Sequence, residues 1–116
     1  ASPVPYAFPT PAQLAERLAS LGVGPADAIV IYDDSAIRTS ARAWFVLTAS
    51  GRGNVAILDG GLAKWRAEGR SLEGGAADVA PAAPAAFTAP TRVRTKADML
   101  ANLESRSAQV LDARSA

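Results

Sequence analysis

Apolar and polar residues along the chain follow two spacings, one helical and one typical of buried strands. Leu14, Leu18 and Leu21 recur at helical intervals and predict a helix over this stretch. Residues 10–13 indicate its start, because threonine caps free amide groups, proline suits the first turn and glutamine completes a capping box. Gly22 is expected to end the helix.

Two short apolar runs separate the helical patterns. Residues 28–32 are apolar and β-branched, with glycine and proline before them and two aspartates after them, as in a strand buried on both faces. Residues 55–58 form a second run of this kind. From Thr39 to Gly51 the spacing is helical. The order strand, helix, strand predicts two parallel strands joined by a helical crossover.

A tight turn and a short helix are expected after the second run. Residues 59–61 are Asp-Gly-Gly, and glycine reaches the positive φ that a tight turn requires. Leu62 and Trp65 then share one face of a short helix, which Gly69 ends. The order of elements predicts an α/β fold with a parallel sheet and helical crossovers.

The composition changes after this helix. Residues 73–91 are rich in alanine, proline and glycine, with too few large apolar side chains to offset the entropy of ordering the chain, and they predict a linker. Beyond it, Thr95 and Asp98 indicate the start of a further helix. Residues 109–111 predict a strand that leads into the Asp-Ala-Arg of residues 112–114.

Large apolar side chains are scarce. Hydrophobic residues make up 49% of the chain, but many of them are alanines, which bury little area. The expected core therefore consists of Leu14, Leu18, Leu21, Ile29, Ile31, Trp44, Phe45, Leu47, Val55, Ile57, Leu58, Leu62, Trp65, Leu100, Leu103, Val110 and Leu111.

Charge and residue usage exclude several functions. The 12 basic and 11 acidic residues give no electrostatic reason to expect nucleic acid or an anionic membrane as a partner. Without an apolar run of membrane-spanning length or a signal-peptide pattern, we expect a cytoplasmic protein. The chain contains neither cysteine nor histidine, so thiol catalysis is excluded and we expect no metal site and no cofactor.

The loop after the first apolar run carries the candidate site. Residues 29–39 pass from a strand through a short loop into a helix, a geometry that directs main-chain amides and a helix dipole at an anion. Asp33 or Asp34 would supply a built-in carboxylate. An equally simple interpretation is that both aspartates cap the loop.

Together with Leu-Asp-Gly-Gly-Leu-Ala-Lys-Trp at residues 58–65, this loop resembles a rhodanese domain. In active copies a cysteine follows the strand directly and an arginine lies near the end of the loop. Asp33 stands at the cysteine position and Arg38 at the arginine position. The resemblance spans residues 8–72, and residues 92–116 are similar to the opening of a second such domain.

The resemblance implies a fragment of a tandem sulfurtransferase that moves sulfane sulfur from thiosulfate or 3-mercaptopyruvate to a thiophilic acceptor. Residues 1–72 would be the latter part of a catalytically silent domain, 73–91 a linker and 92–116 the opening helix and strand of a second domain. The implied partners are the catalytic second domain of the same protein and a small-molecule sulfur donor. No catalytic residue is expected here; the degenerate loop is Asp33, Asp34, Ser35, Ala36, Ile37 and Arg38, supported by Asp59, Asp112 and Arg114.

The family resemblance also implies a three-layer fold whose central parallel sheet is flanked by helices. Its usual opening strand, helix and strand do not precede Ala1, so we expect a sheet that is incomplete or completed by a permuted C-terminal helix-strand unit, residues 92–114. The second possibility requires residues 110–112 to pair with 28–32 or 55–58.

Two other functions remain open. Acidic residues after a parallel strand also occur in magnesium-dependent phosphotransfer domains of the receiver type, for which Asp33, Asp34 and Asp59 would be the ligands. A rhodanese-fold interaction module without catalysis is the other possibility.

Overall fold

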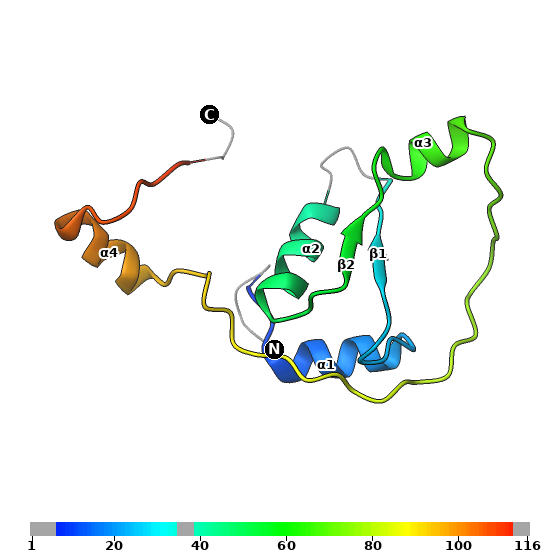
Figure 1. Ribbon diagram of the computed structural model, residues 1–116, viewed down its shortest axis with the longest axis horizontal. Coiled ribbons are helices and arrows are strands. Elements are labelled where there is room, and N and C mark those ends of the chain that lie inside the picture. Colours follow the sequence, from blue (N-terminus) through cyan, green and yellow to red (C-terminus); the bar gives the residue numbers. More distant parts are fainter. Residues whose placement is uncertain (1–6, 35–38, 113–116) are drawn as a thin grey trace.

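The computed structural model describes residues 7–34 and 39–112 (Figure 1). Two short strands, β1 (Ile29–Ile31) and β2 (Val55–Ile57), pair in parallel, with Ile29 opposite Val55 and Ile31 opposite Ile57. The helices are α1 (Pro11–Ser20), α2 (Ser40–Ala49), α3 (Gly61–Ala67) and α4 (Lys96–Ser105). The predicted α/β order with a helical crossover between parallel strands is confirmed.

Helix α1 begins and ends close to the positions that the sequence predicted, because short-range capping interactions fix both ends. At α1, the Thr10 hydroxyl accepts a hydrogen bond from the Gln13 amide at 3.2 Å, and the Gln13 side chain accepts from the Thr10 amide at 2.9 Å. Gly22, just past the helix, has φ +74°, which glycine adopts without the steric cost of a Cβ atom. The capping box and the glycine stop are both confirmed.

The core lies between α1, α2 and the strands. Its buried centre is formed by Leu14, Val46 and Leu47. Partly buried apolar side chains pack around this centre: Phe8, Leu18, Ile29, Ile31, Val55 and Phe87. Phe8 meets Phe45 edge to face, with 6.3 Å between ring centroids.

The expected core was too large. Seven of its members are exposed: Leu21, Trp44, Ile57, Leu100, Leu103, Val110 and Leu111. On α2 the buried residues are Val46, Leu47 and Ala49, whereas Trp44 lies at the edge and donates its indole N–H to the Val55 carbonyl at 3.2 Å. With a sheet of only two strands among the described residues, few apolar side chains find a second layer to pack against.

The expected C-terminal strand is absent from the described residues. Residues 106–112 form no strand, and the sheet contains β1 and β2 alone, so the hypothesis that residues 92–114 complete it is wrong. Asn102 bonds the Ala108 backbone instead, accepting from its N–H and donating to its carbonyl, each at 2.9 Å. In Figure 1, α4 and the segment after it lie away from the sheet.

The predicted linker contains neither helix nor strand, but part of it packs on the fold. Ala85 is buried and Phe87 contacts the core. The segment is therefore not uniformly exposed, because Ala85 and Phe87 cover apolar surface of the core. None of the helices in the described part of the chain has the length and apolar character needed to span a bilayer.

Candidate functional site

Asp33 connects the carboxyl end of β1 to the amino end of α2. Its carboxylate oxygen Oδ2 accepts a hydrogen bond from the main-chain N–H of Ser40, the first residue of α2, at 2.6 Å. Thr39, the N-cap residue, makes no capping hydrogen bond through its side chain, and the Asp33 carboxylate satisfies one of the first-turn amides that have no partner within the helix. The positive end of the helix dipole favours a negative charge at this point.

The turn after β2 brings α3 against the same residue. The Leu62 amide donates to the Asp33 carbonyl at 3.2 Å. Gly61 has φ +56°, and a Cβ atom placed on it would lie 2.9 Å from that carbonyl. The second glycine of the Asp-Gly-Gly turn is thus required both by backbone conformation and by the close approach of the loop.

Asp34 points to a different partner. Its carboxylate forms an ion pair with the Arg66 guanidinium on α3 at 2.9 Å, and each of the two side chains is 53% exposed. Ser35, Ala36, Ile37 and Arg38 lie outside the described residues, as does Arg114.

The supporting residues do not gather around Asp33. The Asp59 side chain is 96% exposed and pairs with Lys64 at 3.3 Å. Asp112 is exposed and belongs to the segment after α4, which lies away from β1 and β2 (Figure 1). The structure therefore brings Asp33 and Asp34 to α2 and α3, and leaves Asp59 and Asp112 elsewhere.

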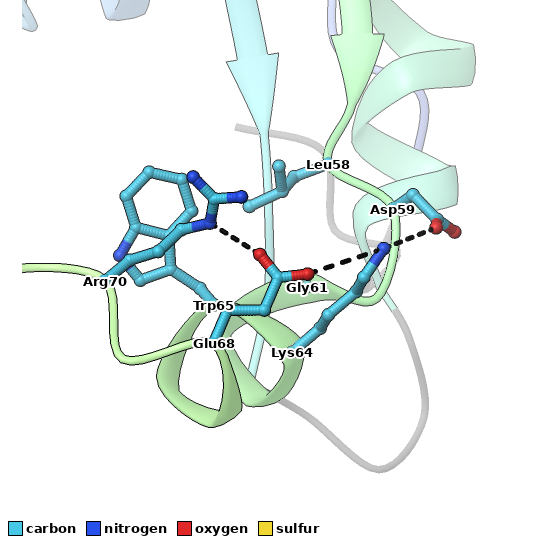
Figure 2. A pocket seen from close by; sticks show the side chains of 7 residues that line it. All are labelled: Leu58, Asp59, Gly61, Lys64, Trp65, Glu68 and Arg70. Atoms are coloured by element: carbon cyan, nitrogen blue, oxygen red, sulfur yellow. Dashed lines mark hydrogen bonds and ion pairs between the residues drawn. The ribbon is translucent and has the colours of Figure 1, made fainter.

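A pocket of about 360 Å³ lies beside the β2–α3 turn (Figure 2), lined by Leu58, Asp59, Gly61, Lys64, Trp65, Glu68 and Arg70. Its charges form a chain: Lys64 pairs with both Asp59 and Glu68, and Glu68 accepts from Arg70 at 2.6 Å. The Arg70 guanidinium lies 5.2 Å from the Trp65 ring centroid, within range of a cation–π interaction.

Sequence reasoning did not identify this pocket. The spacing of Lys64 and Glu68 is the familiar helical i,i+4 pair and could have indicated part of the charge chain. The position of Arg70, beyond the helix end and over Trp65, depends on the path of the chain after Gly69 and has no local signature.

The three candidate magnesium ligands are not combined into a site. Asp33 bonds the Ser40 amide, Asp34 pairs with Arg66 and Asp59 pairs with Lys64. Among residues 7–34 and 39–112, no three cysteine, histidine or acidic side chains are arranged to hold a metal ion. This arrangement does not favour the phosphotransfer alternative, which needs converging carboxylates.

Comparison with known proteins gives one consistent result. Residues 7–68 match the rhodanese-like domain family. A 3-mercaptopyruvate sulfurtransferase of Mus musculus is 36% identical over 117 residues, which cover 99% of this chain and 39% of the relative. A thiosulfate/3-mercaptopyruvate sulfurtransferase 1, mitochondrial, of Arabidopsis thaliana is 37% identical over 73 residues, covering 63% of this chain and 19% of that protein.

The fold comparison agrees. The crystal structure of SseA from Escherichia coli, a rhodanese-fold protein described among the 3-mercaptopyruvate sulfotransferases, superposes with a TM-score of 0.88 and 33% identity. The match covers 98% of this chain and 44% of that structure, so this chain spans less than half the length of these relatives. The chain belongs to the rhodanese-like domain family and is homologous to rhodanese-type sulfurtransferases.

Proposed function

We propose that this chain is the catalytically silent part of a cytoplasmic tandem sulfurtransferase. The parent protein would move sulfane sulfur from thiosulfate or 3-mercaptopyruvate to a thiophilic acceptor. Its catalytic cysteine would reside in a second rhodanese-like domain of the same protein. The observation that carries the proposal is the hydrogen bond between the Asp33 carboxylate, directly beyond β1, and the Ser40 amide at the start of α2.

The chemistry of sulfur transfer explains why an aspartate at position 33 would not carry sulfur. The reaction needs a nucleophile that takes up sulfane sulfur as a persulfide, and helix amides and the helix dipole stabilise its thiolate. A carboxylate carries the same charge and satisfies the same donor, but it forms no persulfide. Asp33 would then preserve the loop conformation of an active copy without its reactivity.

The relatives support the choice of substrates. Those named above carry 3-mercaptopyruvate or thiosulfate in their names, and this chain covers 39% of the mouse protein. The donor, the acceptor and the pairing with a catalytic domain are accordingly part of the proposal. The exposed apolar residues of α4, Leu100 and Leu103, are consistent with a helix that packs on further parts of the parent.

A cysteine scan of the loop tests the assignment. Asp33→Cys introduces the single thiol of the chain, and the Ser40 amide with the α2 dipole should lower its pKa below the ordinary value of about 8.5. The matched control is Asp34→Cys combined with Arg66→Ala, because position 34 is half-exposed and its cationic partner, which would itself lower a thiol pKa, is then removed. The pH dependence of alkylation by iodoacetamide gives both values.

The proposal expects a thiol pKa at position 33 at least one unit below that at position 34. It also expects no sulfur transfer to cyanide by the unmodified chain, with either donor. Equal thiol pKa values at the two positions would remove the basis for placing Asp33 at the nucleophile position. Assays of the full-length parent with each donor then identify its substrate.

A further inference from the structure

Residues 79–88 cross the ends of two helices. In Figure 1 the segment between α3 and α4 runs along α1 before it reaches α4. The Ala82 amide donates to the Ala19 carbonyl of α1 at 2.9 Å, and the Thr88 amide donates to the Ser50 carbonyl at the end of α2 at 3.0 Å. Both acceptors belong to the last turn of a helix, whose carbonyls have no donor four residues further along within the helix; the Ala19 carbonyl also accepts from the Gly22 amide at 3.0 Å.

Each helix end carries a glycine where the segment passes. Gly22 follows α1 with φ +74°, and a Cβ atom there would lie 3.1 Å from the Ala80 carbonyl oxygen and 3.3 Å from the Val79 Cβ. Gly51 follows α2 with φ +95°, and its Cβ would lie 3.3 Å from the Thr88 hydroxyl. Contacts this tight leave little room for a side chain at either helix end.

Between its two bonded amides the segment buries apolar surface. Ala85 is 6% exposed, and Phe87 packs against the cluster of Leu14, Val46 and Leu47. Burial and hydrogen bonding thus coincide in one stretch of chain, whereas residues 71–80 are exposed.

We propose that residues 79–88 form a strap that belongs to the rhodanese-like domain, caps the C-terminal ends of α1 and α2, and fixes at Thr88 the point where the chain departs toward α4. This inference does not rest on the proposed function.

The strap shortens the stretch of chain that is free to extend before α4. If residues 73–95 were a free connection before α4, they would span up to about 80 Å when extended. With the chain held at Thr88, residues 89–95 span only about 25 Å. The strap would therefore hold α4, and any domain that begins with it, near the ends of α1 and α2.

Amide hydrogen exchange in the unmodified chain tests the strap directly. We expect the N–H groups of Ala82 and Thr88 to exchange at least tenfold more slowly, after correction for intrinsic rates, than those of Ala83 and Ala86. Uniform exchange at unstructured rates throughout residues 73–91 would overturn the proposal.

A pair of glycine variants tests it independently. Gly22 and Gly69 both follow a helix with similar φ, +74° and +68°, but a Cβ atom on Gly69 meets nothing within 4 Å. Both substitutions by alanine strain the backbone, whereas only Gly22→Ala presses on the strap. We expect Gly22→Ala to accelerate exchange at the Ala82 amide at least tenfold, and Gly69→Ala to leave it within twofold.

Equal exchange at Ala82 in the two variants would contradict the strap. If Gly22→Ala does not fold, the exchange pattern of the unmodified chain still decides the question.

Discussion

The guanidinium of Arg52 donates a 2.6 Å hydrogen bond to the main-chain carbonyl of Asp27, across 25 positions of sequence. A second bond from the same nitrogen reaches the Gly24 carbonyl at 2.7 Å. Asp27 precedes β1 and Arg52 precedes β2, so this buried side chain joins the amino ends of the two parallel strands. Asp33 performs the corresponding connection at the carboxyl end of β1, where it bonds the start of α2.

Replacement of Arg52 should therefore destabilise the fold. Arg52→Ala removes two charge-assisted hydrogen bonds and leaves two carbonyls without this donor, which we expect to lower the free energy of unfolding by about 2–4 kcal/mol. Urea unfolding followed by circular dichroism measures the change. Arg17→Ala, at an exposed position on α1, is the control and should change the free energy by less than about 0.5 kcal/mol. Similar losses in both variants would contradict a clamping role for Arg52.

The two loop aspartates should differ when each is replaced by alanine. Asp33→Ala removes the acceptor of the Ser40 amide and should cost about 1 kcal/mol, the usual worth of a helix cap. Asp34→Ala breaks a half-exposed ion pair with Arg66 and should cost about 0.5 kcal/mol or less. Hydrogen exchange at the Ser40 amide provides the site-specific measurement: it should accelerate in the first variant and stay unchanged in the second.

Replacing a leucine by alanine should cost far more stability on α2 than on α4. Leu47→Ala on α2 empties a buried position that is 7% exposed, and we expect a loss of about 3 kcal/mol. Leu103→Ala on α4 alters a side chain that is 71% exposed and should cost less than about 0.5 kcal/mol. Thermal and urea unfolding compare the two. A large loss from Leu103→Ala would mean that α4 packs against something in solution.

The stability of the first turn of α4 should decrease at acidic pH. Hydrogen bonds from the backbone N–H and the hydroxyl of Thr95 hold the pKa of Asp98 below its ordinary value of 3.8. Because the folded pKa is the lower one, the carboxylate stabilises the helix at pH values above 3.8, and this contribution is lost as the pH falls through the lowered pKa.

Carbon chemical shifts over residues 96–105 measure this effect. They should lose helical character upon acidification, and Asp98→Asn should remove that dependence. The α1 helix is the internal control, because its capping box uses the amide of Gln13, which does not titrate. An unchanged α4 in the unmodified chain down to pH 2 would contradict the assignment.

Features decided by neighbouring residues could be predicted from the sequence. The capping boxes at Thr10 and Thr95 and the positive φ of Gly60 depend on a few adjacent positions. For the same reason the two strands were placed within one or two residues of their observed bounds. The resemblance to the rhodanese family, carried by the Asp33 loop and the Asp-Gly-Gly turn, is likewise a matter of local motifs and is confirmed by the comparisons.

Features that depend on distant parts of the chain could not be predicted from the sequence. Residues 109–111 have the composition of a strand, but no partner strand lies beside them in the part of the chain that the structure describes, and Val110 and Leu111 are exposed. Phe87 is partly buried against the core although it lies in a stretch whose composition predicts a linker. Arg52 bonds the carbonyls of Gly24 and Asp27, which the fold brings to it from the turn before β1.

The sequence by itself determined most of the local elements of this chain, its family and its lack of a thiol, because these depend on residue identity and short-range conformational preference. Only the tertiary structure decided which apolar side chains form the core, that Asp33 bonds α2 while Asp59 remains outside, and that residues 79–88 close the ends of two helices. Burial and hydrogen-bond partnership across many residues are properties of the assembled chain, and no local pattern encodes them.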